Sequence, residues 1–188
     1  MKTLFKTYKP VIRFVFTFLT VYFVLALGYK WYLDGSKASS YQPDFVTYQV
    51  AYQSQALLNI FGFKSNIALQ EGEEWVRFYF NNTYVIRVIE GCNAISVIVL
   101  FIAFIVAFAS TIKKTILYIL AGAALIYAVN VLRIALIAVG LYHYPDMEHI
   151  LHGVIFPLII YGMVFLLWVF WVNNFVKLKK KNAEHSAL

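Results

Sequence analysis

The fold is decided by residues 93–141, which read NAISVIVLFIAFIVAFASTIKKTILYILAGAALIYAVNVLRIALIAVGL. Two apolar runs in this stretch, Asn93–Ile112 and Thr115–Leu141, flank the pair Lys113 and Lys114. Each run reaches the length of about 20 residues that a helix needs to cross the hydrocarbon core of a bilayer. Two such runs joined by a short basic turn predict a pair of antiparallel transmembrane helices.

The whole chain has the composition of an integral membrane protein. Hydrophobic residues make up 62% and charged residues 13% of its 188 residues, and the mean hydropathy is +0.71. Two further apolar runs, Val11–Tyr32 and Ile150–Val176, are also long enough to span. The chain lacks the alternating ten-residue segments of a barrel, so the spans are expected to be helices. The sequence therefore predicts an all-α integral membrane protein with about four transmembrane helices.

The region between the first two spans predicts a small exported segment. A polar linker, Ser36–Pro43, leads into the run Phe45–Phe61, whose apolar residues recur near helical spacing. We expect an amphipathic helix there that lies on the membrane surface or covers a site, through Val46, Val50, Leu57, Ile60 and Phe61. The β-rich runs Trp75–Phe80 and Tyr84–Ile89 are separated by a turn signal and predict a hairpin.

The basic residues predict the orientation in the membrane. Ten of the 16 basic residues fall in three clusters, which are Lys2, Lys6, Lys9 and Arg13; Lys113 and Lys114; and Lys177, Lys179, Lys180 and Lys181. By the positive-inside rule, these clusters place both termini and the short turn in the cytoplasm. The net charge of +7 is thereby explained by topology and by attraction to lipid headgroups, and no nucleic-acid motif is present. No clean cleavage site follows the first apolar run, so we expect it to be retained as an anchor rather than removed as a signal peptide.

These observations divide the chain into four parts. Residues 1–32 form an N-terminal cytoplasmic tail and the first transmembrane helix, and residues 33–90 form the exported linker, amphipathic helix and hairpin. Residues 91–176 form a core of transmembrane helices two to four, which contains the candidate site, and residues 177–188 form a basic cytoplasmic tail.

Cys92, the only cysteine, is the first candidate for chemistry. Counting about 1.5 Å per helical residue, it lies about 32 Å from Lys113, near the opposite face of the membrane. We expect it at or just before the first turn of the second span, where unpaired amides and the helix dipole favour an anion such as a thiolate. The alternative is an inert buried thiol, because free cysteine behaves as a small hydrophobic residue.

Arg133 is a charged residue inside an apolar run, about 28 Å from Lys114 by the same count. Such a residue faces a polar cavity or a partner, or else its side chain extends to the headgroups. Asn130 lies three residues earlier on the same helix face, which favours a polar patch. A guanidinium group suits a carboxylate or a developing oxyanion.

His149 and His152 lie one turn apart at the start of the last span. Imidazole is a suitable general base near neutral pH, and the alternative is a structural histidine at the interface. His152 is one turn deeper, closer to the expected level of Cys92 and Arg133, and is therefore favoured over His149.

Two other histidines and a metal site are less favoured. His143 lies in the preceding loop, and His185 falls on the cytoplasmic side. The pair His149 and His152 lacks a compelling third ligand, so neither a metal nor a cofactor is expected.

The order of these motifs resembles the exosortase and archaeosortase family. Gly91-Cys92-Asn93-Ala94 stands at the place of the cysteine motif, and Asn130-Val131-Leu132-Arg133 matches the Asn-x-x-Arg motif. The small size and the segment 151–162 look like the exosortase F (XrtF) subgroup. The family usually follows its cysteine with Ser-Gly or Thr-Gly, and here Asn93-Ala94 stands there. Its histidine is usually followed by glycine four residues later, which fits His149 and Gly153, whereas the depth count favours His152.

The resemblance implies a membrane-embedded cysteine protease or transpeptidase at the outer face of the bacterial cytoplasmic membrane. Its partners would be exported proteins that end in a short motif, a hydrophobic helix and a basic tail, with an envelope lipid or glycan as the acceptor. Cys92 would be the nucleophile, His152 or alternatively His149 the base, and Arg133 would orient substrate or stabilise negative charge. Glu90 and Asn130 would support this site.

Two other classes of function remain open from the residues alone. A non-enzymatic scaffold or transporter subunit would use Asn130 and Arg133 to bind helices together. A lipid-modifying transferase would use a histidine base and would not need Cys92.

The predicted orientation can be tested with reporter fusions. A reporter fused after Lys181 should be cytoplasmic, and one inserted near Ser39 should be exported, because the clustered basic residues stay inside. Compartment-specific alkaline phosphatase and fluorescent-protein fusions measure this. Both reporters on one side of the membrane would contradict the four-part division.

Overall fold

The computed structural model describes residues 2–38, 43–70 and 72–176 of the chain. Three of its helical segments are long and apolar enough to cross a membrane, and they are Tyr8–Lys37, Ile112–His143 and Pro145–Phe175. The first belongs to α1 (Lys2–Ala38) and the second is α4 (Ile112–His143). The first, third and fourth predicted spans are therefore confirmed as helices of spanning length.

The third of these segments is built from several helical pieces. It comprises η2 (Pro145–Met147), α5 (Glu148–Ile150), the π-helix η3 (Leu151–Ile155), α6 (Phe156–Trp171) and a second π-helix, η4 (Val172–Val176).

The second predicted span, Asn93–Ile112, is shorter in the structure than expected. Its helix, α3 (Ile95–Ala107), has 13 residues and a length of about 20 Å, which is less than the hydrocarbon core of about 30 Å. It begins late because Ala94 has left-handed backbone angles, with φ 64°, and it ends at Phe108. The structure thus has three helices of spanning length instead of four, and a short apolar helix that contacts α1, α4 and α6.

The segment between α2 and α3 contains a sheet of three strands rather than the predicted two. β2 (Val76–Phe80) and β3 (Thr83–Val88) are antiparallel and correspond to the predicted hairpin runs. Asn81 and Asn82 both have positive φ, which the tight turn between these strands requires and asparagine tolerates. The additional strand, β1 (Ser65–Ala68), pairs antiparallel with β2, so the order is β1-β2-β3.

The helix α2 (Phe45–Ile60) joins this sheet to the membrane helices. Asp44 caps its N-terminus by accepting hydrogen bonds from the Val46 and Thr47 amides, at 3.0 and 3.2 Å. The buried hydroxyl of Ser54 donates to the Val131 carbonyl of α4 at 3.1 Å. The buried face consists of Thr47, Val50, Ala51, Ser54 and Leu58. α2 therefore packs on α4 and the sheet through this face, while the apolar side chains of Ile60 and Phe61 are exposed.

The other end of the bundle has an aromatic core. The Phe104 and Trp168 rings stack with centroids 4.4 Å apart, and the Trp171 indole N–H donates to the Phe108 carbonyl at 3.1 Å. The Tyr118 hydroxyl donates to the Leu167 carbonyl at 2.7 Å. These contacts fix α6 to the turn between α3 and α4.

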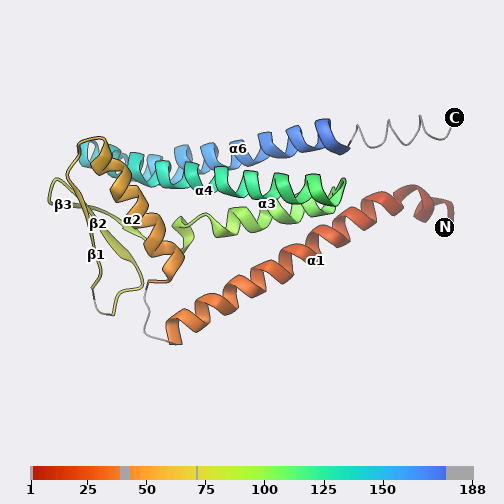
Figure 1. Cartoon of the computed structure of the whole chain (residues 1–188), viewed down its shortest axis with the longest axis horizontal. Helices are drawn as coiled ribbons and strands as arrows, with labels where there is room; N and C mark the ends of the chain where they lie inside the picture. The colour runs from red at the N-terminus through yellow and green to blue at the C-terminus, as the bar shows by residue number, and fades with distance from the viewer. Residues whose placement is uncertain (1, 39–42, 71, 177–188) are drawn as a thin grey trace.

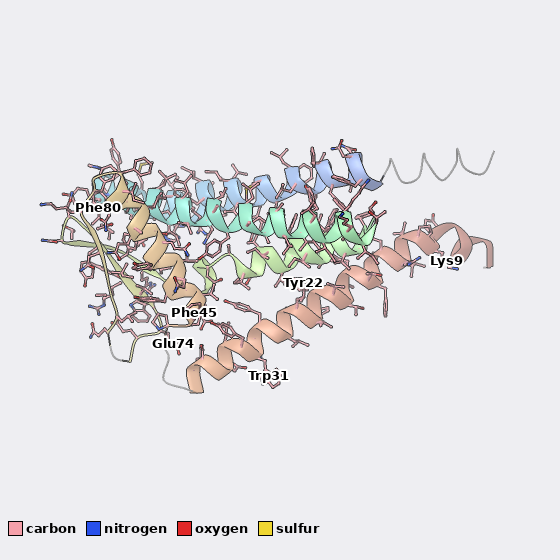
Figure 2. All side chains as sticks on the ribbon, in the orientation of Figure 1. Lys9, Tyr22, Trp31, Phe45, Glu74 and Phe80 are labelled. Carbon is pink, nitrogen blue, oxygen red and sulfur yellow. The ribbon has the colours of Figure 1, made fainter. Side chains whose placement is uncertain are left out.

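The helices α1, α4 and α6 run along the length of the molecule, with α2 and the sheet gathered at one end (Figure 1). The start of α1, the turn between α3 and α4, and the end of α6 lie together at one end. At the opposite end lie α2, the sheet and the end of α4. The side chains labelled in Figure 2 show the same division, with Lys9 far from Phe45, Glu74 and Phe80.

The packing of α3 on α4 generates a prediction about Gly122. A Cβ added there would come within 2.3 Å of the Phe101 ring, and that ring is fully buried. Gly122→Leu should therefore lower stability by about 1–3 kcal/mol or more through overpacking, measured as thermal unfolding in detergent. Gly162→Leu on α6 is the matched control, because nothing lies within 4 Å of a Cβ at that position. Equal melting temperatures for the two variants would contradict this packing.

Candidate active site

Cys92 lies in a 3-10 turn, η1 (Glu90–Cys92), that follows β3 directly. Its side chain is free and 8% exposed, and its amide already donates to the Ile89 carbonyl at 2.8 Å. This turn directly precedes α3, whose first residue is Ile95, so Cys92 lies just before the first turn of that helix. β3 therefore leads directly into the turn that carries Cys92, at the start of α3.

Asn130 links this turn to α4. It is fully buried, and its amide nitrogen donates to the Cys92 carbonyl at 2.7 Å. Its amide oxygen accepts a hydrogen bond from Nη1 of Arg133 at 3.3 Å. The structure thus brings Cys92, Asn130 and Arg133 together in one hydrogen-bonded chain, although Cys92 and Asn130 are 38 positions apart in the sequence.

Arg133 is half-buried, and one of its hydrogen-bond donors is buried with it. Its Nε is buried without a hydrogen-bond partner within the part of the chain that the structure describes. A guanidinium group whose only role was to reach the headgroups would keep its donors in water. The buried, unpaired Nε is instead available to an acceptor that enters the site, such as a carbonyl or carboxylate oxygen.

The two candidate histidines differ in their surroundings. His152 lies in η3, is half-buried, and is close enough to Arg133 and Glu148 to interact with their charges. His149 and His143 are exposed. The structure therefore places His152, rather than His149, beside the arginine of the site.

The π-helical geometry at His152 was not expected from the sequence, although the sequence contains a signal for it. Pro157 has no amide hydrogen and cannot donate to the carbonyl four residues earlier. The chain widens there, and the Phe156 amide donates to the Leu151 carbonyl five residues earlier. Such π-helical turns occur frequently at functional sites.

Glu90 forms an ion pair away from the Cys92 side chain. Its carboxylate lies 3.4 Å from Nζ of Lys37, which also contacts Glu74 at 3.3 Å. These pairs are exposed to water and contribute little to stability. They tie the end of α1 to the turn that carries Cys92.

Asn93 is a structural residue that the sequence analysis missed. It is 1% exposed, and its amide nitrogen donates to the Tyr29 hydroxyl at 2.7 Å and the Thr47 hydroxyl at 3.1 Å. Its amide oxygen accepts from the Ile95 amide at 3.0 Å, which caps α3. One side chain therefore joins α1, α2 and α3 next to Cys92.

Within residues 2–38, 43–70 and 72–176, no group of three or more His, Cys, Asp or Glu side chains is placed to hold a metal ion.

Ala94 holds a backbone conformation that suits glycine. Its φ of 64° lies in the left-handed region, where a Cβ costs about 1–2 kcal/mol. This is the position at which the exosortase pattern noted above usually has glycine. Ala94→Gly should raise stability by up to about 1 kcal/mol, measured as thermal unfolding in detergent.

Ala103→Gly is the matched control for this substitution. Ala103 is fully buried within α3, where glycine should lower stability by about 1 kcal/mol. If both variants were destabilised equally, the left-handed turn at Ala94 would be wrong.

The comparison with protein families identifies one matching family. The family model described as transmembrane exosortase (Exosortase_EpsH) matches residues 3–172, which is far more of the chain than the segment that carries the three motifs. No curated protein and no solved structure matches the chain. Because the match extends over most of the membrane helices and the whole candidate site, the chain belongs to the transmembrane exosortase family.

Proposed function

We propose that this chain is a cysteine protease or transpeptidase that processes C-terminal sorting signals of exported proteins within the membrane. The observation that carries the proposal is the chain of hydrogen bonds from the Cys92 carbonyl through Asn130 to Arg133. It fixes a potential nucleophile at a set position relative to a guanidinium group with an unpaired buried donor. His152, close to that guanidinium group, supplies a base.

The reaction would begin with attack of the Cys92 sulfur on the scissile carbonyl. His152 would accept the thiol proton, and Arg133 would stabilise the developing oxyanion. As the carbon–nitrogen bond breaks, the proton would pass from His152 to the departing amine, leaving a thioester on Cys92.

The second half of the reaction would release the thioester. An amine or hydroxyl of an acceptor would attack the thioester carbonyl, pass its proton to His152, and restore the thiol. An envelope lipid or glycan would make the enzyme a transpeptidase, and water would make it a protease.

The location of the site supports processing at the outer face of the bacterial cytoplasmic membrane. Lys9 (Figure 2) and the first turn of α4, which carries Lys113 and Lys114, lie at the end of the bundle opposite the sheet. Cytoplasmic segments are enriched in such basic residues. With that end inside, Cys92 would open toward the exported side, where a substrate helix with a basic tail would present its motif. Membership of the exosortase F subgroup is part of the same proposal and rests on the segment 151–162.

Substitution separates this mechanism from its rivals. In cells that co-express a tailed substrate, Cys92→Ala and Cys92→Ser should abolish processing, because the serine hydroxyl is a far weaker nucleophile there. Arg133→Lys should lower the rate by about 10²-fold or more, since lysine loses the planar donor geometry. Immunoblots that resolve precursor from product, with membrane levels of each variant, measure the effect.

The chain offers matched controls for each change. Arg87→Lys lies on the sheet and should process normally, and His149→Ala is the control for His152→Ala. Loss of the base should cost about 10²–10⁴-fold at position 152 only. Normal processing by Cys92→Ala would eliminate the cysteine mechanism and leave the scaffold or the histidine-dependent lipid transferase.

A further inference from the structure

A cavity opens between α1 and the end of α3, at the end of the bundle remote from Cys92. Its volume is about 540 Å³, and its lining includes Lys9, Arg13, Phe14, Thr17, Val106 and Ala109. The mechanism proposed above uses none of these residues. Figure 2 shows Lys9 at this end of α1, well away from the sheet.

Among the described residues, no acidic side chain balances the charge around this cavity. The acidic residues of the described part all lie between Asp34 and Glu148, in elements at the opposite end of the bundle. The ion pairs that those described residues form, such as Lys37 with Glu74, are also at that end. Lys9 and Arg13 therefore face the cavity without an acidic partner among residues 8–37, 43–70 and 72–175.

The helix dipoles at this end do not neutralise the two cations. The negative end of α3 lies at Ala107, and the positive end of α4 lies at Ile112, across a turn of four residues. The two partial charges have opposite sign and similar size, so they largely cancel. The charged side chains that line the cavity are those of Lys9 and Arg13.

The walls of the cavity are apolar below the cations. Phe14 lies one residue beyond Arg13 on α1, and its ring is 4.3 Å from that of Phe108. Val106 and Thr17 continue the wall along the two helices. A ligand that fits this arrangement has an anionic group at one end and hydrocarbon at the other.

We propose that this cavity binds the phosphate headgroup of an anionic phospholipid, with its acyl chains along α1 and α3. Basic pockets between membrane helices on the cytoplasmic side bind such headgroups through charge. A free phosphate ion would gain nothing from the apolar wall. The bound lipid would act as the counter-ion of Lys9 and Arg13 and would fill the gap between the two helices.

Native mass spectrometry of the purified full-length protein in detergent tests this proposal. We expect the protein to retain phosphatidylglycerol about thirtyfold more strongly than phosphatidylcholine, as two interfacial cations would provide. The double variant K9Q/R13Q should lower this preference to about threefold or less. The double variant K113Q/K114Q removes the same charge outside the cavity and should keep the preference.

A third variant tests the space in the cavity separately from its charge. Thr17→Phe leaves both cations in place but fills the space, and it should also lose the bound lipid. Thermal unfolding of each variant without lipid shows whether it is folded.

Three results would overturn the proposal. The first is equal retention of the two lipids by the unsubstituted protein. The second is the same loss in both double variants, which would show a general attraction of surface charge. The third is displacement of phosphatidylglycerol by inorganic phosphate at the same concentration, which would show a site for free phosphate.

Discussion

A buried hydrogen bond of 2.7 Å, from the Asn130 amide to the Cys92 carbonyl, connects the two halves of this molecule. On one side of it lie the sheet and the 3-10 turn, and on the other lies the long helix α4. A buried amide left without a partner would cost about 1–3 kcal/mol, so each half constrains the other. The oxygen of the same side-chain amide accepts a hydrogen bond from Arg133. The position of the guanidinium group therefore depends on the position of the turn.

The helix α1 has a different kind of attachment. In the membrane region it packs on α3, through Phe14 against Phe104 and Phe108 at one end and Tyr29 with Asn93 at the other. The first contact is aromatic and the second is a hydrogen bond to a fully buried amide. Because α1 contacts α3 near both ends, it also holds the turn after Ile89. The same turn is bound to α4, so the residues around Cys92 are held from two directions.

Hydropathy was sufficient to predict the long helices, because runs such as Thr115–Leu141 admit few other structures in a membrane. Hydropathy did not predict the bounds of α3, because its start is set by the backbone angle of Ala94 rather than by apolar character. The strand Ser65–Ala68 was missed because four residues without a strong β pattern become a strand only when β2 lies beside them. The gathering of Cys92, Asn130 and Arg133 was predictable from helix length and spacing. The role of Asn93 was not, because its partners lie 64 and 46 residues away in the sequence.

The bond to Asn130 also fixes how deep Cys92 lies. Asn130 is 16 residues from Lys114 along one unbroken helix, a distance of about 24 Å, so Cys92 is nearer the basic end than the count along the sequence suggested. With the basic end in the cytoplasm, as proposed above, a hydrocarbon core of about 30 Å would place Cys92 several ångströms below the outer surface, just before the short helix α3. A thioester at that depth would meet little bulk water, and expelling water from a reactive intermediate suppresses its hydrolysis. That depth would therefore favour an acceptor that arrives through the lipid phase, and the partition between transfer and hydrolysis would depend on the position of Asn130 along α4.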